Sequence, residues 1–309
     1  MRRELRIRDG SHIDGYLRTI REAGPSVEWD IILNGKNFYT SGAFGFEQYD
    51  YSMIPPGCTL SGLGCDSTTL WVEYPFQPDG AQQVECLTLG SRSGPCGFVG
   101  LRSLKIAPTV GLLQSNLGIV GVHVWSDDSI IESVVIEGIS GTRRAGGGQR
   151  EGFGLLVNRA GKPIAPGGHR VYGVTIDISE PNDGGGPEDE IYATGAFFGT
   201  KSDYRLPVES RATEIVVRNI RGPKDRRAHC AFALTDYFEL SRAANHGRFV
   251  RAVFNDTGGS TSSRILCSYL RAEGTLVDCE GGAGDGWFGF EVYSSELTLE
   301  PSKGMPFGA

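Results

Sequence analysis

The chain has 309 residues, of which 45 are glycine, and it carries a formal net charge of −7 at pH 7. Glycine at about twice its usual share favours many turns and short strands over long helices. The negative charge gives no support to binding of nucleic acid or of an anionic membrane surface. No run of about 18 apolar residues is present, so no membrane span is expected.

The N-terminal residues 1–6 are charged and lack an apolar stretch, so the sequence predicts no signal peptide. We therefore expect a cytoplasmic protein, or a secreted one if a signal segment has been removed. Seven cysteines, an odd number, agree with reduced thiols. No Cys-x-x-Cys motif occurs and no cysteine–histidine cluster has ligand spacing, so we expect neither zinc nor an obligatory transition metal.

One helix is predicted, over residues 11–24. Ser11 can cap it, and Asp14 stands three residues later as in a capping box. A single apolar stripe runs along this helix through Ile13, Tyr16, Leu17 and Ile20. Gly24 followed by proline ends it. A strand over residues 29–33 and an Asn-Gly turn follow.

A short apolar pattern then recurs at irregular intervals: apolar, two free positions, apolar, one free position, apolar. The clearest copies are Leu101, Leu104, Ile106; Ile131, Val134, Ile136; and Val171, Val174, Ile176. Short β-rich units that cannot bury their own face predict stacking into a solenoid. An amphipathic helix across the first unit would cap its open end.

The order helix, strand, Asn-Gly turn and then "IPPGCTLSGLGCDSTTL" resembles the first part of the pectate-lyase-like right-handed parallel β-helix superfamily. The resemblance covers about residues 11–140, and the rest follows by the repeat pattern. It implies an all-β fold, a single-stranded right-handed parallel β-helix with an N-terminal capping helix. We expect one domain over residues 1–309, with a tail at 300–309. A β-sandwich or jelly roll is the alternative, although hairpin turns are scarce.

Four further strands are predicted at residues 121–125, 154–158, 195–199 and 230–234, and charged side chains gather in the turns that follow them. If Val122 and Val124 point inward, His123 and Trp125 point outward, because side chains alternate along a strand. Stacked strands about 4.8 Å apart would bring the turns into one row. The candidate catalytic residues are His123, Asp127, Arg159, Lys201 and Asp236. The candidate substrate-binding residues are Trp125, Asp128, Asn158, Arg143, Asp203 and Tyr237.

Each candidate also has a structural interpretation. Turns are polar because they are hydrated, and His123 with Trp125 could form a stacked pair that fills the outer wall. The acidic segment 183–190 could hold Ca²⁺ but lacks EF-hand spacing, so no cofactor is expected. Of the stretches typical of polygalacturonase-like β-helices, only Asp127-Asp128 has a counterpart here.

The functional hypothesis is an enzyme on a carbohydrate or uronate-like substrate. Its chemistry would be acid–base, as in a lyase, an epimerase or a hydrolase. One alternative is a cytosolic isomerase or cyclase of small molecules, and another is a non-catalytic binding or structural protein. The expected partner is a small molecule or an oligosaccharide. The sequence leaves the oligomeric state open.

Overall fold

The computed structural model is built almost entirely of strands. It describes residues 2–178, apart from 25, 45–48, 74–80, 82, 93–96, 114–116, 127, 140–141, 144–148, 151 and 160–167. Beyond residue 178 it describes only strand segments, the last of them at residues 291–293. Two short helices, α1 (Asp14–Glu22) and α2 (Val110–Leu113), belong to the described part.

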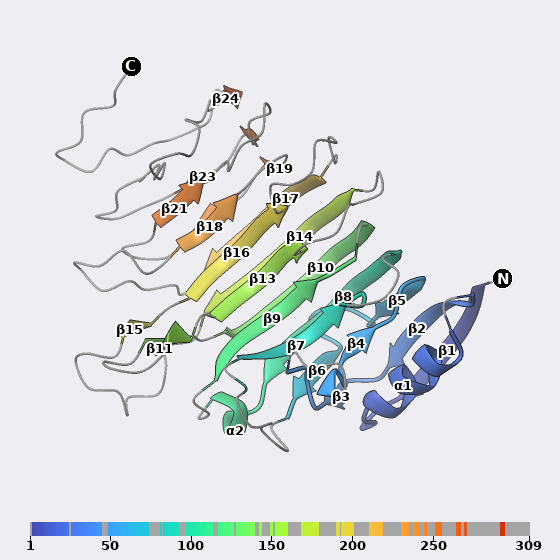
Figure 1. Ribbon diagram of the computed structural model, residues 1–309. Helices are drawn as coiled ribbons and strands as arrows, with labels where there is room; N and C mark the ends of the chain where they lie inside the picture. Colours follow the sequence, from blue (N-terminus) through green and yellow to red (C-terminus); the bar gives the residue numbers. More distant parts are fainter. Residues whose placement is uncertain are drawn as a thin grey trace, which may run out of the picture.

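A fourteen-stranded sheet forms one wall of the molecule (Figure 1). Its strands are β1 (Arg2–Arg8), β2 (Glu28–Asn34), β3 (Asn37–Thr40), β5 (Cys58–Ser61), β6 (Thr69–Val72), β8 (Phe98–Pro108), β10 (Asp128–Ile139), β14 (His169–Ile178), β17 (Ser210–Arg218), β19 (Phe238–Ser241), β20 (Ala244–Asn245), β22 (Arg264–Leu266), β23 (Tyr269–Leu270) and β24 (Glu291–Tyr293). Every pair that its described strands make is parallel.

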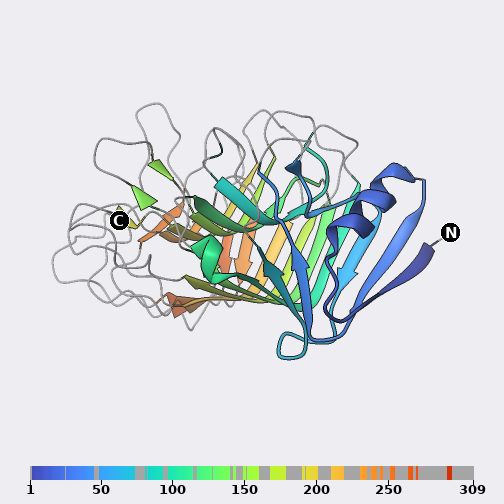
Figure 2. The ribbon, with the colours of Figure 1, turned by 90° about the horizontal axis from the view of Figure 1, so that it is seen from below.

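A seven-stranded parallel sheet forms the facing wall, as Figure 2 shows from a second direction. Its strands are β4 (Met53–Ile54), β7 (Gln83–Leu89), β9 (Gly118–Val124), β13 (Gly152–Arg159), β16 (Ala193–Thr200), β18 (Cys230–Leu234) and β21 (Arg251–Phe254). From β7 to β19 the large strands belong alternately to the two walls. A small antiparallel sheet of β11 (Thr142–Arg143), β12 (Gln149–Arg150) and β15 (Glu190–Ile191) lies apart from them.

The predicted fold is therefore wrong in its architecture. Stacked parallel strands were expected and are present, but the described residues form two parallel sheets rather than one closed right-handed β-helix. The apolar pattern indicates which side chains of each strand face the core. It carries no information on whether the walls close, because that depends on the connections between strands.

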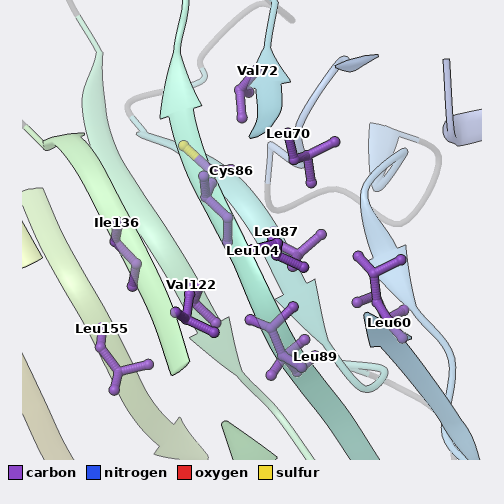
Figure 3. Packing of buried hydrophobic residues seen from close by; sticks show 14 of the residues in the cluster. Leu60, Leu70, Val72, Cys86, Leu87, Leu89, Leu104, Val122, Ile136 and Leu155 are labelled. Atoms are coloured by element: carbon purple, nitrogen blue, oxygen red, sulfur yellow. The ribbon is translucent and has the colours of Figure 1, made fainter. Parts of the chain in front are cut away.

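The core lies between the two large sheets. Leu60, Leu104 and Ile136 reach it from the fourteen-stranded sheet, while Val122 and Leu155 reach it from the other (Figure 3). All nine residues of the three clearest apolar triplets are at most 1% exposed. The triplets therefore mark the side chains that β8, β10 and β14 direct inward.

A left-handed residue explains the two free positions inside each triplet. Ser103 and Ser133 both have φ of 53°, and Gly173 has φ of 62°. These residues occupy matching places in β8, β10 and β14, between the first and second apolar residues of each triplet. A positive φ bends the strand, so the residue after the bend faces the core again one position late. The irregular spacing in the sequence is thus the signature of a bent strand.

Helix α1 covers the end of the core next to β1. Ile13, Leu17 and Ile20 are buried, whereas Tyr16 is 40% exposed. Ser11 does not cap this helix, because its N-cap is Ile13 and no side chain bonds the cap. Asp14 instead accepts hydrogen bonds from Oγ1 of Thr40 and the backbone N–H of Ser41, at 2.6 and 3.0 Å. The predicted capping box is replaced by a link from the helix to β3.

Gly121 is required by close packing in the middle of β9. A Cβ atom there would overlap Cγ2 of Ile136 and would lie 2.5 Å from the backbone O of Gly154. Gly121→Ala is therefore expected to lower the free energy of unfolding by about 1–3 kcal/mol, the usual cost of overpacking. Urea denaturation followed by circular dichroism measures it.

The matched control is Gly15→Ala in α1, where an added Cβ meets no atom within 4 Å. That variant should be neutral or more stable by up to about 1 kcal/mol, because alanine favours helix. If Gly121→Ala were as stable as this control, the close approach of β9 to its neighbours would be incorrect.

Candidate functional site

A buried polar cluster lies on the outer face of the seven-stranded sheet. Glu85 and Thr88 belong to β7, and His123 belongs to the neighbouring strand β9. Thr88 and His123 are directly paired, as are Glu85 and Val120. Val122 and Val124 enter the core, so His123 points to the other side of the sheet. The predicted directions of these three side chains agree with the structure.

Two loops complete the cluster. Arg92 follows β7, and Trp125 follows β9. The loops are held together at their start, since the backbone N–H groups of Trp125 and Ser126 both donate to the carbonyl of Leu89, at 2.8 and 3.1 Å. Gly90 has φ of 87°, and a Cβ atom there would lie 2.8 Å from the backbone N of Ser126. Glycine at this position therefore lets the two loops approach each other.

Glu85 is the centre of the cluster and is only 6% exposed. Its carboxylate accepts hydrogen bonds from Oγ1 of Thr88 at 2.8 Å and from the guanidinium of Arg92. Nδ1 of His123 lies 2.8 Å from Oε1 of the same carboxylate. The backbone of Glu85 is fixed as well, because its N–H and C=O both bond to Ala43. A carboxylate with this many partners is held in one orientation.

The pKa of Glu85 reflects two opposed effects. Burial alone would raise it, but the charge and hydrogen bond of His123, with Arg92 and Thr88, lower it from 4.5 to about 2. Glu85 is therefore ionised throughout the neutral range. An ionised carboxylate can only accept hydrogen bonds, so the Nδ1 atom that faces it carries the hydrogen and donates it.

Arg92 connects this carboxylate to a second one and to an aromatic ring. Its Nε atom lies 3.4 Å from Oδ2 of Asp50, which is 3% exposed. Its guanidinium carbon lies 4.8 Å from the ring centroid of Trp125, within the range of a cation–π contact. Two acidic groups therefore face one arginine, and His123 provides the second potential cation.

Trp125 contacts His123 as well as Arg92. The ring centroids of Trp125 and His123 are 4.4 Å apart, and the ring planes are tilted by 39°. In the part of the chain that the structure describes, Nε1 of Trp125 and Oγ of Ser126 are buried without a hydrogen-bond partner. An unpartnered buried donor costs about 1–3 kcal/mol, so this corner of the cluster is destabilising.

His123 is 7% exposed, so it does not stand in an open groove. On its own face of the sheet His123 is paired with Leu156, part of a small apolar cluster with Val120 and Phe153. The imidazole thus has the polar cluster on one side and an apolar wall on the other.

The other predicted site residues are placed only in part. Asp127, Lys201, Asp203, Asp236 and Tyr237 lie outside the described residues. Asn158 and Arg159 end β13 directly after Val157, which pairs with Val124, so the backbone puts them at the same end of the sheet as Trp125. Arg143 belongs to β11 in the small sheet, and Asp128 begins β10 in the fourteen-stranded sheet. Asp128 is therefore in a different wall from His123.

Sequence reasoning missed Glu85, Thr88, Arg92 and Asp50. Glu85 was the detectable one, because it is a single carboxylate within the apolar run Val84 to Leu89. Such a charge in a strand needs a buried partner or an exposed face. The residues next to Asp50 and Arg92 in the sequence do not indicate that these two side chains lie close to Glu85 of β7.

Two further histidines lie in polar pairs. His12, which is exposed, has Nε2 2.8 Å from Oε2 of Glu73 and stacks on Tyr39. His169 and Ser129 are buried partners on β14 and β10, with Nδ1 2.9 Å from Oγ. Neither pair joins the cluster around Glu85.

Among the described residues, no group of three or more histidine, cysteine or acidic side chains could hold a metal ion. Residues 183–189 of the acidic segment lie outside the described residues, and Glu190 begins β15. Cys58, Cys65 and Cys86 are free thiols. Burial raises the pKa of Cys58 to about 11 and that of Cys86 further, so these two side chains stay protonated and behave as core residues.

Comparison of the chain with protein-family models, with curated proteins and with solved structures finds no match. The resemblance to the pectate-lyase-like superfamily therefore stays a prediction. None of the helices in the described ranges is long and apolar enough to cross a membrane.

Proposed function

We propose that the chain is an enzyme that transfers protons at His123, with Glu85 as the residue that positions it. The observation that supports this is the 2.8 Å contact between Nδ1 of His123 and the ionised carboxylate of Glu85. With the hydrogen on Nδ1, the lone pair of the neutral ring is on Nε2. An imidazole oriented in this way by a carboxylate is suited to act as a general base and then as a general acid.

The proposed substrate is a polar carbohydrate or a uronate-like compound. The backbone of β13 puts Asn158 and Arg159 at the same end of the sheet as Trp125, and we propose that these two residues supply a polar contact and a cation. A cation close to a general base favours reactions in which negative charge develops on a substrate oxygen. Proton abstraction beside a carbonyl or carboxyl group is such a reaction.

A second candidate is an isomerase or cyclase of small molecules. It is favoured by the apolar wall of Val120, Phe153 and Leu156 on the same face of the sheet as His123. An apolar surface with few polar groups suits a compact organic ligand better than a long polysaccharide. The proton-transfer role of His123 is the same in both candidates, and the two differ in the substrate and the product.

The test compares His123→Asn with His12→Asn, since both histidines lie 2.8 Å from a carboxylate but only His123 is buried. Turnover of uronate oligosaccharides is followed by the absorbance of unsaturated products, and small-molecule isomerisation by chromatography. His123→Asn should lower kcat by about 10²–10⁴-fold, while His12→Asn should leave it unchanged. Full activity of His123→Asn would show that the reaction does not use this histidine.

A measurement that needs no substrate complements the kinetics. Nitrogen-15 NMR distinguishes the two tautomers of a neutral imidazole. The wild-type protein should show His123 with its hydrogen on Nδ1, and Glu85→Gln should weaken this preference, because an amide can either donate or accept. A hydrogen on Nε2 in the wild type would contradict the proposed base.

A further inference from the structure

Arg92 lies between two carboxylates that come from different parts of the chain. One belongs to Glu85 of β7, and the other belongs to Asp50, which comes shortly before β4. Nη2 of Arg92 donates a hydrogen bond to Oε1 of Glu85, and Nε lies 3.4 Å from Oδ2 of Asp50. A guanidinium group is planar and rigid, so contacts at two of its nitrogens fix both its direction and its plane. The position of Arg92 therefore depends on Asp50 as well as on Glu85.

Asp50 is held in place by helix α1 and by the edge of the seven-stranded sheet. Its carbonyl accepts a hydrogen bond from Nη1 of Arg21, which belongs to the last turn of α1. Ala43 forms antiparallel bridges with both Asp50 and Glu85, so the backbone of both acidic residues is tied to the same residue. The side chain of Asp50 is only 3% exposed. Asp50 is thus a fixed anchor for Arg92 rather than a hydrated surface charge.

One oxygen of Glu85 is shared by Arg92 and His123. Nη2 of Arg92 and Nδ1 of His123 both contact Oε1, while Oγ1 of Thr88 donates to Oε2. An arginine without a second partner could turn two N–H groups toward the carboxylate, which is the bidentate arrangement that such pairs favour. It would then compete with His123 for Oε1. Asp50 opposes this rotation, because it faces Nε of the guanidinium.

Arg92 also reaches the imidazole through Trp125. The guanidinium carbon lies 4.8 Å from the ring centroid of Trp125, and the same ring is 4.4 Å from that of His123. A shift of Arg92 would therefore disturb two of the groups that border His123, the carboxylate of Glu85 and the indole ring.

We propose that Asp50 is a second positioning residue for proton transfer at His123 and that it acts through Arg92. The inference rests on the proposed function, because an effect of Asp50 on turnover requires that His123 carries out the chemistry. Asp50 keeps Nε of Arg92 turned toward itself, so that Oε1 of Glu85 stays available to Nδ1 of His123. The imidazole then keeps one tautomer and one orientation. Loss of this contact affects the chemical step rather than substrate binding.

Asp50→Asn removes the charge and keeps the shape of the side chain, and Asp30→Asn is the matched control. Asp30 also pairs with an arginine, Arg2, at 2.7 Å, but both side chains are more than 40% exposed. With the uronate oligosaccharides and small molecules named above, Asp50→Asn should lower kcat by about 10–100-fold and change KM by less than about twofold. Nitrogen-15 NMR should show a weaker preference for hydrogen on Nδ1 of His123 in this variant. Asp30→Asn should change neither measurement.

Arg92→Lys tests the route from Asp50 to His123. A lysine ammonium is a point charge without the planar fork, so it cannot hold both carboxylates in the same way. This variant should reproduce the kinetic and NMR changes, and adding Asp50→Asn to it should cause no further loss, because residues that act through one another are not additive. Thermal unfolding shows whether each variant is folded, and Arg92→Lys decides the matter if Asp50→Asn does not fold.

The possible outcomes separate this inference from the proposed function. Wild-type kcat and an unchanged tautomer in Asp50→Asn would overturn the role of Asp50, while an inactive His123→Asn would leave the proposed function standing. Additive losses for Asp50→Asn and Arg92→Lys would overturn the route through Arg92. If His123→Asn kept full activity, the proposed function would fail, and the tautomer measurement alone would decide whether Asp50 orients His123.

Discussion

Replacing Glu85 with alanine is expected to lower the free energy of unfolding by about 3–5 kcal/mol at pH 7, the cost of breaking a buried ion pair from one side. The loss has a specific cause. Arg92 and His123 would keep their buried donors but lose the carboxylate that both of them face. Urea denaturation at a fixed pH, followed by tryptophan fluorescence and by circular dichroism, measures the change.

The control for Glu85 is Glu132→Ala. Glu132 also pairs with an arginine, Arg102, at 3.4 Å, but both side chains are more than 40% exposed. Removing it should cost no more than about 1 kcal/mol, because water screens a surface ion pair. Equal losses in the two variants would mean that the cluster around Glu85 is not buried as described.

The effect of Glu85 should also depend on pH. Its pKa in the folded protein is about 2, below the ordinary value of 4.5, so the folded state favours the ionised form. The stabilisation is therefore complete above about pH 4.5 and is lost as the pH falls through about 2. The difference in stability between the wild type and Glu85→Gln should shrink over this interval, and a difference that grows on acidification would contradict the assigned direction.

Leu17→Ala is expected to destabilise the protein by about 2–5 kcal/mol, the range for a large-to-small change in a core. Leu17 is 0% exposed and belongs to the same core cluster as Ile13 and Ile20. Without its side chain the end of the core beneath α1 would have a cavity. Thermal and urea unfolding of the purified variant measure the loss.

Tyr16→Ala is the matched change on the same helix, since Tyr16 is 40% exposed. It removes a larger side chain but should cost far less than Leu17→Ala, because Tyr16 is partly in water and its removal leaves no enclosed cavity. A loss below about 0.5 kcal/mol for Leu17→Ala, the size of an ordinary surface change, would show that α1 does not cover the core.

Local patterns in the sequence predicted a good part of the fold. The helical stripe identified Ile13, Leu17 and Ile20 as buried, and the apolar triplets identified the inward residues of β8, β10 and β14. These patterns succeed because period and burial are properties of a few neighbouring residues. The two free positions in each triplet are the sequence sign of the bend at Ser103 and Ser133. The cause of the bend, a positive φ, is visible only in the backbone.

The relation between the two walls was not predictable in the same way. It depends on how segments such as the one that brings Asp50 to β7 pass from one sheet to the other. The predicted capping box was wrong for a related reason, since Asp14 bonds to Thr40, 26 residues away, instead of capping α1. Long-range partners can replace local ones without a trace in the nearby sequence.

In the candidate site, too, local patterns were predictable and contacts between distant residues were not. Alternation along β9 predicted that His123 turns away from Val122 and Val124, and the structure agrees. The groups that decide its chemistry come from β7 and from two loops. Glu85 is 38 residues from His123, and only the pairing of β7 with β9 brings the two together. The residues next to Glu85 and His123 in the sequence offer no signal for that pairing.

The parallel pairing of the strands has a consequence for how the chain folds. Leu101, Ile131 and Val171 occupy the same place in successive strands of one sheet, and they are separated by 30 and 40 residues. Each strand therefore finds its neighbour at an intermediate distance along the chain, and none of these pairs joins the two ends of the protein. Contacts at such separations can form in sequence order while the chain is synthesised. The N-terminal strands and α1 can thus assemble on the ribosome first and act as a template for each later strand.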